Sequence, residues 1–314
     1  MSLQSWLSTL GVREFPATRA GDRLAAWEIA ESCWIAAHEQ IRERGGRFSA
    51  LWADEPDDRV VYALLWCEGQ YYLLRTRPVD MQLPSVSRIW ANADRPERYT
   101  RDMYGIDFTD ALDSRRWARH QAWSKKDFPL LKDFPAEGRR QEASTDPDAP
   151  YGYHQVQGVQ VYEIPVGPVH AGIIEPGHFR FNAAGERILS LEERLGYVHK
   201  GIEKRAAGQS VAQVARLASR VSGDSAAAHS LAFALAVEAA TGLDCLPEAV
   251  QIVRAVALER ERIANHLGDI GAICNDVGFA FMQMQCSRLR ELWQRRQHHM
   301  FGHRLMMDVV VPGG

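Results

Sequence analysis

The sequence has few cysteines, and they do not form a metal-binding or redox pair. The five cysteines are odd in number and scattered along the chain, and no Cys-x-x-Cys motif joins any two of them: Cys33, Cys67, Cys245, Cys274 and Cys286. This usage is typical of a reducing compartment. It argues against a disulfide framework, a zinc site or an iron–sulfur cluster held by this chain alone.

Excess basic charge and long apolar segments are also missing. A formal net charge of −3 gives no electrostatic footprint for nucleic acid. The longest apolar run, Leu231 to Ala240, is interrupted by Glu238 and is too short to span a bilayer. We therefore expect no nucleic-acid partner and no transmembrane segment. Nucleophile-elbow, P-loop, dinucleotide-binding and zincin motifs are absent as well, so a hydrolase or a nucleotide-binding enzyme has no support.

The first 135 residues have the pattern of an α+β domain. Asp22 is placed to cap an amphipathic helix, whose apolar stripe begins at Leu24 and which Gly45-Gly46 would end. A second helix is expected from Pro96 through Tyr104. Three strands in an antiparallel sheet are expected between these helices, the last two joined by the hairpin signal Glu68-Gly69-Gln70: Phe48–Trp52, Val60–Trp66 and Tyr71–Arg75.

A change in composition marks the domain boundary. Residues 137–153 hold two prolines and almost nothing apolar, which is typical of a surface linker. Beyond it we expect a strand over Val159–Val166, with Pro165 at its end or on a sheet edge. A hairpin should follow, with strands His178–Asn182 and Arg187–Leu191. The rest of the chain should be helical, in four segments: Ser210–Arg220, Ala226–Thr241, Pro247–Val277 and Phe279–Met306.

Three polar segments in this second part are candidates for chemistry. His170, Glu175 and His178 lie in a turn-forming segment at the mouth of the hairpin. If they are partly buried, a carboxylate and imidazoles placed in this way can pass protons, because burial moves both pKa values toward neutrality. The alternative is an exposed turn with solvated side chains.

The second segment lies within the long helix. Arg262, His266 and Asp269 share one helix face, and Asp276 lies two turns further along it. Such a ladder is usually a solvated ion-pair face. Flanking isoleucines and Leu267 suggest instead a mostly buried helix. Polar side chains on a buried helix are costly unless they are paired, so they would indicate a functional site more strongly.

The third segment, Arg220 to Ser225, joins two helical patterns. Its small, hydroxylic and acidic side chains can cap the helix that begins near Ala226. The same residues can instead line a buried site.

Several long motifs resemble a known family. Residues 96–108 (PERYTRDMYGIDF) and 130–135 (LLKDFP) resemble the signature of the small hydrophilic C subunit of respiratory complex I. Residues 167–181, 194–204 and 261–271 resemble its D subunit. They are still more similar to the large subunit of membrane-bound, energy-converting [NiFe] hydrogenases, including formate hydrogenlyase, in which both modules are fused in this order.

This resemblance implies a fold and a division into domains. We expect an α+β domain like the C subunit of complex I over residues 1–135, a linker over 136–153, and a hydrogenase large subunit-like domain over 154–314. The last should be mainly helical, with a small antiparallel β region. Relative to the family, the third part ends early at Gly314. The helical core should then be incompletely covered, and the protein should expose an apolar patch or depend on a partner for its solubility.

The resemblance also bears on the metal. True hydrogenases carry two cysteines at the positions of Ser222 and Ser225, where they hold nickel and iron. A serine hydroxyl is hard and weakly acidic, so it cannot replace a soft thiolate for this metal pair. The second cysteine pair of the family lies beyond Gly314. We therefore expect no metal site in this chain.

Quinone contact and proton transfer are the remaining roles that the resemblance implies. By similarity to complex I, His178 and Asp276 match a histidine and an aspartate near the quinone, whereas Gly223 replaces the quinone-bonding tyrosine. Glu175 resembles the glutamate used for proton transfer in hydrogenases. Glu175, His178 and Asp276 are therefore the candidate relay residues. Nine further residues are candidates for lining the corresponding cavity: His170, Arg220, Ser222, Gly223, Asp224, Ser225, His229, His266 and Asp269.

The resulting hypothesis is a hydrophilic subunit of a complex I-like or formate hydrogenlyase-like oxidoreductase. It would contact a small subunit that carries an iron–sulfur cluster, and ion-translocating membrane subunits, as a peripheral protein on the cytoplasmic face of the inner membrane. It would relay protons or contact quinone without a cofactor of its own. The alternative is a catalytically inactive structural subunit that couples these partners.

Overall fold

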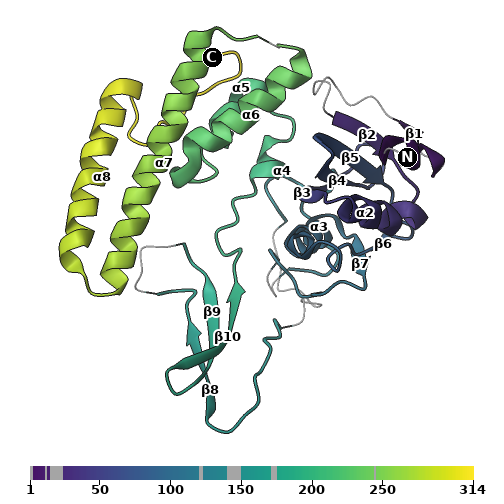
Figure 1. Ribbon diagram of the computed structural model, residues 1–314, viewed down its shortest axis with the longest axis horizontal. Coiled ribbons are helices and arrows are strands. Elements are labelled where there is room, and N and C mark those ends of the chain that lie inside the picture. The colour runs from purple at the N-terminus through teal and green to yellow at the C-terminus, as the bar shows by residue number, and fades with distance from the viewer. Residues whose placement is uncertain are drawn as a thin grey trace. The chain divides into compact units, whose positions relative to one another are not determined.

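The computed structural model describes residues 3–10, 13–14, 24–119, 123–139, 150–170, 175–243 and 245–314. The chain forms two compact units, which divide between His199 and Lys200 (Figure 1). Helices and strands are mixed in the first unit, and the second unit is helical. The sequence-based domain limits, which place the boundary within residues 136–153, stay a prediction, and residues 140–149 of that linker lie outside the described part.

A five-stranded sheet organises the first unit. Its order is β1-β2-β5-β4-β3, with these bounds: β1 Arg13–Glu14, β2 Leu24–Glu28, β3 Arg47–Asp54, β4 Val60–Cys67 and β5 Gln70–Thr76. The three predicted strands are confirmed as β3, β4 and β5. The β4–β5 loop places Glu68 and Gly69 at φ values of 50° and 83°. Two consecutive positive φ angles define the tight hairpin turn that the sequence indicates.

The predicted helix from Asp22 is wrong over its first part. Leu24–Glu28 is strand β2, which pairs in parallel with β5, so the sheet is mixed rather than antiparallel. Three consecutive residues of β2, Ala25 to Trp27, are buried, so this strand lacks the usual alternation. A short apolar run of this kind cannot be told from a helix by its period. The helix begins later, as a 3₁₀ turn at Glu31–Cys33 and then α2 at Trp34–Glu43; Asp22 itself lies outside the described residues.

Two helices and the sheet share one core. Helix α1 (Leu3–Thr9) contributes Leu3 and Leu7, and α2 contributes Trp34 and Ile41, all fully buried. Complete burial of a large aliphatic or aromatic side chain stabilises the fold by about 1.5–3 kcal/mol. These four residues therefore fix both helices on the sheet.

Helix α3 (Asp94–Tyr104) follows the short strand β6 (Gln82–Pro84) and a 3₁₀ turn at Ala91–Ala93. It begins two residues before the predicted start at Pro96. Pro96 therefore lies in the first turn, where its missing N–H costs no helical hydrogen bond. Gly105, at φ 72°, ends the helix, and β7 (Asp107–Thr109) then pairs with β6.

A three-stranded antiparallel sheet completes the first unit. Its order is β10-β9-β8, with β8 at Val161–Val166, β9 at His178–Ala184 and β10 at Arg187–Arg194. All three predicted strands are confirmed. Pro165 lies on the edge strand β8, as predicted, where its missing donor leaves no gap in the sheet.

The second unit confirms the four predicted helices. Helix α4 (Ile202–Ala206) precedes them, and they are α5 (Val211–Ala218), α6 (Ala226–Thr241), α7 (Glu248–Asp276) and α8 (Ala280–Phe301). A capping box between Ser210 and Gln213 starts α5. A 3₁₀ turn, η3 (Gly223–Ser225), leads into α6.

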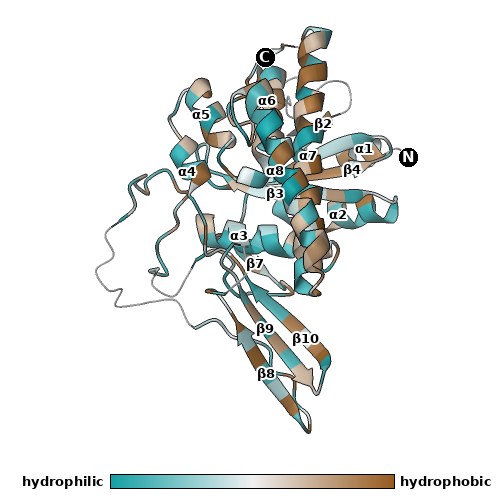
Figure 2. Cartoon of the chain, turned by 90° about the vertical axis from the view of Figure 1, so that its left-hand side faces the viewer, coloured by the Kyte–Doolittle hydropathy of each residue, from teal (hydrophilic) through white to brown (hydrophobic). Residues whose placement is uncertain are grey.

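Helix α7 is not the mostly buried helix that its isoleucines suggest. Ile263, Ile270 and Ile273 are 39%, 48% and 63% exposed. Val256, Ile263 and Ile270 recur every seven residues along the helix, and Val277 follows directly after its last residue with the same spacing. The four residues therefore lie in one row, and Figure 2 shows hydrophobic segments along α7. The expected exposed apolar surface is therefore present on this unit, and we call this row of four residues the α7 stripe.

Candidate functional site

The candidate residues fall in both units, and each group is described within its own unit. His178 begins β9 and is 8% exposed. Its Nδ1 lies 2.9 Å from the carbonyl oxygen of Gly167, and Arg180 Nε lies 3.3 Å from its Nε2. Because a carbonyl only accepts and a guanidinium only donates, Nδ1 carries the proton and Nε2 accepts. The contacts therefore fix a neutral imidazole.

Two residues that sequence reasoning missed hold this imidazole. The ring of Tyr153 lies 5.1 Å from the ring of His178, and the Arg180 guanidinium lies 4.4 Å over Tyr153. Glu163 pairs with Arg180 at 2.9 Å. Burial raises the pKa of Tyr153. The only sequence signal was the position of Arg180, two residues after His178 on the same strand face.

The other two residues of the predicted turn have different surroundings. Glu175 is exposed, whereas His170 is half-buried. Within the described residues, the Nε2 atom of His170 is buried and has no hydrogen-bond partner. Of the two alternatives for this turn, a partly buried group agrees with the structure at His178, and a solvated side chain agrees with it at Glu175. Residues 171–174 of this motif lie outside the described part.

In the second unit, the loop from Arg220 to Ser225 is held from two directions. Arg220 forms a bidentate pair with Asp308, with two N–O distances of 2.6 Å. Ser219 donates to the same carboxylate at 3.0 Å. From the other side, the Asn265 amide on α7 donates to the carbonyl oxygen of Asp224 at 2.6 Å.

The cap of α6 does not come from this loop, which corrects the sequence-based interpretation. Ser225 occupies the N-cap position but makes no side-chain cap hydrogen bond. Glu261 on α7 accepts from the backbone N–H groups of Ala227 and Ala228, at 2.6 and 3.1 Å. Burial raises the pKa of Glu261, the two N–H donors oppose this shift, and the charge of Asp224 adds to it.

A small polar cleft lies beside the loop. Gly223, Asp224 and Glu261 line it together with Asn265 and two arginines, Arg290 and Arg304. Its volume of about 10 Å³ accommodates roughly one water molecule. A Cβ atom on Gly223 would lie 3.3 Å from Leu305 Cδ1, a close contact that a small shift of the leucine side chain would relieve. The cleft does not fit a quinone head group.

The remaining candidates lie on helix surfaces. His229 on α6 and His266, Asp269 and Asp276 on α7 all lie at least partly open to solvent in their unit. Arg262 pairs with Glu259 at 2.9 Å, one turn earlier. This part of α7 therefore agrees with the solvated-face interpretation.

The donor chemistry of the loop does not fit a nickel–iron centre. Ser222 and Ser225 offer hydroxyl oxygens where soft thiolates are needed. The cysteines of the second unit lie elsewhere: Cys245 between α6 and α7, Cys274 on α7 and Cys286 on α8. In the part of the chain that the structure describes, three or more histidine, cysteine or acidic side chains do not come together as a metal site.

Sequence similarity to known proteins extends over much of the chain. Residues 28–140 match the family described as the respiratory-chain NADH dehydrogenase 30 kDa subunit. Formate hydrogenlyase subunit 5 of Escherichia coli is 35% identical over 234 residues, which are 74% of this chain and 41% of that protein. Hydrogenase-4 component G of the same organism is 36% identical over 74% of this chain and 42% of its own length. The fused C/D subunit of NADH-quinone oxidoreductase from Bacteroides fragilis is 29% identical over 74% of this chain and 46% of its own length.

The first part of the chain is therefore a domain of the 30 kDa subunit family. Taken as a whole, the chain is similar over 74% of its length to these hydrogenase components and to the fused C/D subunit, as the sequence motifs predict. It spans less than half the length of the three relatives. Within the described residues, every helix is too short or too polar to cross a membrane.

Proposed function

We propose that this chain is a hydrophilic subunit of a complex I-like or formate hydrogenlyase-like oxidoreductase assembly, and that it takes part in electron transfer without a [NiFe] centre of its own. The single observation that carries the proposal is the similarity to hydrogenase components over 74% of the chain, combined with serine at both positions of the first cysteine pair. Serine hydroxyls do not supply the thiolates that such a centre needs.

Metal analysis of the purified assembly tests the absence of this centre. We expect the nickel content not to rise in proportion to the amount of this chain. One nickel per chain, retained after gel filtration, would overturn this part of the proposal.

Within the assembly, proton relay is the role we favour, with Glu175 and His178 of the first unit and Asp276 of the second unit each as a candidate residue. Exposed Glu175 and buried, neutral His178 come three residues apart in sequence, at the start of β9. A neutral imidazole with a bonded Nδ1–H and an accepting Nε2 is suited to pass a proton, once Arg180 moves away from Nε2. Quinone contact is the second role. It would require surfaces other than the one-water cleft beside Gly223.

Substitution in the intact assembly tests the relay. Glu175→Gln and His178→Gln keep side-chain size and remove proton transfer, so each should lower coupled turnover at least tenfold. Glu186→Gln, an exposed glutamate in the β9–β10 turn, is the matched control and should have no effect.

The alternative is a structural subunit that couples an iron–sulfur subunit to ion-translocating membrane subunits on the cytoplasmic face of the membrane. The exposed α7 stripe favours it, because a long apolar row on one helix is typical of a partner contact. If the Glu175 and His178 variants leave electron transfer and ion pumping unchanged, the structural role stands and the relay fails.

A further inference from the structure

The α7 stripe belongs to a longer apolar seam on the exposed side of α7. Ile252 and Ile273 each lie four residues before a member of the stripe, and both are exposed. Together with the stripe they follow the a and d positions of a heptad, the spacing with which one helix packs along another. The seam extends over residues 252–277, which is roughly 38 Å of helix. A helix of similar length would therefore cover it.

The apolar residues of the seam are placed symmetrically about its middle. Counted from the centre of residues 252–277, Ile252 and Val277 lie equally far in opposite directions, and so do Val256 and Ile273. When two copies of α7 run antiparallel, Ile252 of each copy therefore faces Val277 of the other, and Val256 faces Ile273.

Two polar residues, Glu259 and His266, fill the remaining d positions of the seam, and both are exposed. In the antiparallel arrangement Glu259 faces Ile270 of the other copy, and His266 faces Ile263. Two acidic or two imidazole side chains therefore do not meet across the seam, so the arrangement avoids like-charge contacts at its centre.

The charges beside the seam show the same symmetry. Arg262 and Asp269 lie on one flank of it and are both exposed. They are seven residues apart, beyond the three- and four-residue spacings at which side chains of one helix meet. In the antiparallel arrangement Arg262 of each copy comes beside Asp269 of the other. The pairing therefore forms two ion pairs of opposite charge.

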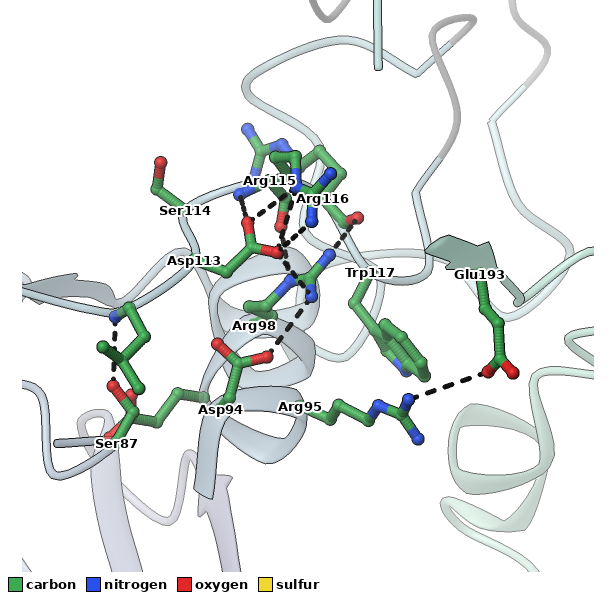
Figure 3. A network of polar contacts seen from close by, with 12 residues as sticks. Ser87, Asp94, Arg95, Arg98, Asp113, Ser114, Arg115, Arg116, Trp117 and Glu193 are labelled. Carbon is green, nitrogen blue, oxygen red and sulfur yellow. Dashed lines mark hydrogen bonds and ion pairs between the residues drawn. The ribbon is translucent and has the colours of Figure 1, made fainter. Parts of the chain in front are cut away.

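Arg262 is open to such a contact, unlike the buried arginines of the first unit. Figure 3 shows Arg98 with Asp94 and Asp113, at N–O distances of 3.3 and 3.1 Å, and its side chain is 8% exposed. Arg262 pairs with Glu259 at 2.9 Å, but its side chain is 55% exposed. A guanidinium has five N–H donors, so Arg262 can donate to a second carboxylate from the solvent side.

We propose that this seam binds a second copy of the chain, in a two-fold symmetric pair with the two α7 helices antiparallel. A two-fold interface uses the same patch on both copies, so the patch must be complementary to itself. The apolar residues and the flanking charges both meet this condition. The proposed function names no second copy, and the pairing depends on neither the proton relay nor the metal. A different subunit on the seam is the competing occupant.

Light scattering coupled to gel filtration of the full chain tests the pairing. We expect a mass of about twice the 35.4 kDa of one chain. Ile270→Asp places a charge in the seam and should raise the dissociation constant of the dimer by about tenfold or more. Leu289→Asp, on α8, is the matched control and should leave the dimer unchanged, because Ile270 and Leu289 are 48% and 47% exposed.

Charge reversal tests the antiparallel orientation. Arg262→Asp and Asp269→Arg should each weaken the dimer about three- to tenfold, because each creates two like-charge contacts between the copies. The double variant again places opposite charges beside each other and should recover most of the affinity. Because the two residues do not meet within one helix, recovery requires contact between copies.

A monomer at high micromolar concentration overturns the proposal and leaves the seam to a different subunit. Equal weakening by Ile270→Asp and Leu289→Asp also overturns it, because it would show unspecific apolar association. A double charge variant as weak as the single ones overturns the antiparallel arrangement.

Discussion

Glu97 should make the first unit less stable as the pH rises toward neutrality. This residue lies in the first turn of α3 and is 1% exposed. Ser85 Oγ donates to its Oε2 at 2.6 Å, and the Val86 N–H donates to its Oε1 at 2.7 Å. Burial raises its pKa to about 7, although both hydrogen bonds oppose the shift, and the Asp94 charge adds to it.

The magnitude follows from the difference between the folded pKa, about 7, and the ordinary value of 4.5. That difference of roughly 2.5 units corresponds to about 3 kcal/mol. Below pH 4.5 the carboxyl group is protonated in both states, so the penalty is absent. Between pH 4.5 and 7 only the folded chain keeps the proton. Stability therefore falls as pH rises and reaches its full deficit above pH 7.

Glu97→Gln should remove this pH dependence. The neutral amide can still accept from the Val86 N–H and donate to Ser85 Oγ, so the packing is kept. Urea unfolding followed by tryptophan fluorescence should show the variant gaining about 3 kcal/mol over the wild type between pH 4.5 and 8. Glu39→Gln, on the exposed side of α2, is the control. Parallel pH profiles of the wild type and Glu97→Gln would refute the reasoning.

Three further predictions concern other buried or bonded groups. The side chains of Arg254 and Glu238 are each 6% exposed and pair at 2.6 Å. Arg254→Met leaves a buried carboxylate without its cation, so it should lower the free energy of unfolding in urea by about 3–5 kcal/mol. The double variant with Glu238→Leu should recover most of this free energy, and no recovery would contradict the prediction. Burial lowers the pKa of His38 to about 3, so its NMR resonances should not titrate between pH 7.5 and 5. In a Glu97→Gln background, which removes the opposing contribution of Glu97, stability should fall as pH drops from 6.5 toward 3. The ¹⁵N shifts of His178 should report a protonated Nδ1, and Arg180→Met should move the Nε2 shift; an unchanged Nε2 shift would show that the contact does not form.

Elements with a local signal could be predicted from the sequence. Strand β4 buries alternate residues over most of its length, and the boundaries of α6 match the expected ones because Ser225 and Gly242 flank an uninterrupted helical pattern. Strand β2 has no such signal, because both its faces are covered and its apolar residues are consecutive. Its parallel pairing with β5, more than forty residues away, is a tertiary choice that no local period reports.

In the candidate sites too, the residue types could be predicted from the sequence, but the contacts between distant residues could not. His178 and the loop from Arg220 could be singled out by residue type. Their partners could not, because Asp308 lies 88 residues from Arg220 and Glu261 lies 34 residues from the N–H group it caps. Contacts across such separations depend on how the helices pack, and no spacing in the sequence encodes them.

The residues that contact the loop from Arg220 to Ser225 bear on its function. If Ser222 and Ser225 were remnants of a decayed metal site, the loop would be expected to lose its supports along with its ligands. Instead, Asp308 holds its first residue, Asn265 holds its centre, and Glu261 caps the helix that follows it. The bond from the Ala227 N–H to Glu261 is buried and costly to lose, whereas the Arg220–Asp308 pair and the Asn265 bond are exposed and contribute less. These contacts hold the loop without any metal ligand, so we expect the second unit to act by shaping and coupling an assembly rather than by chemistry at the loop itself.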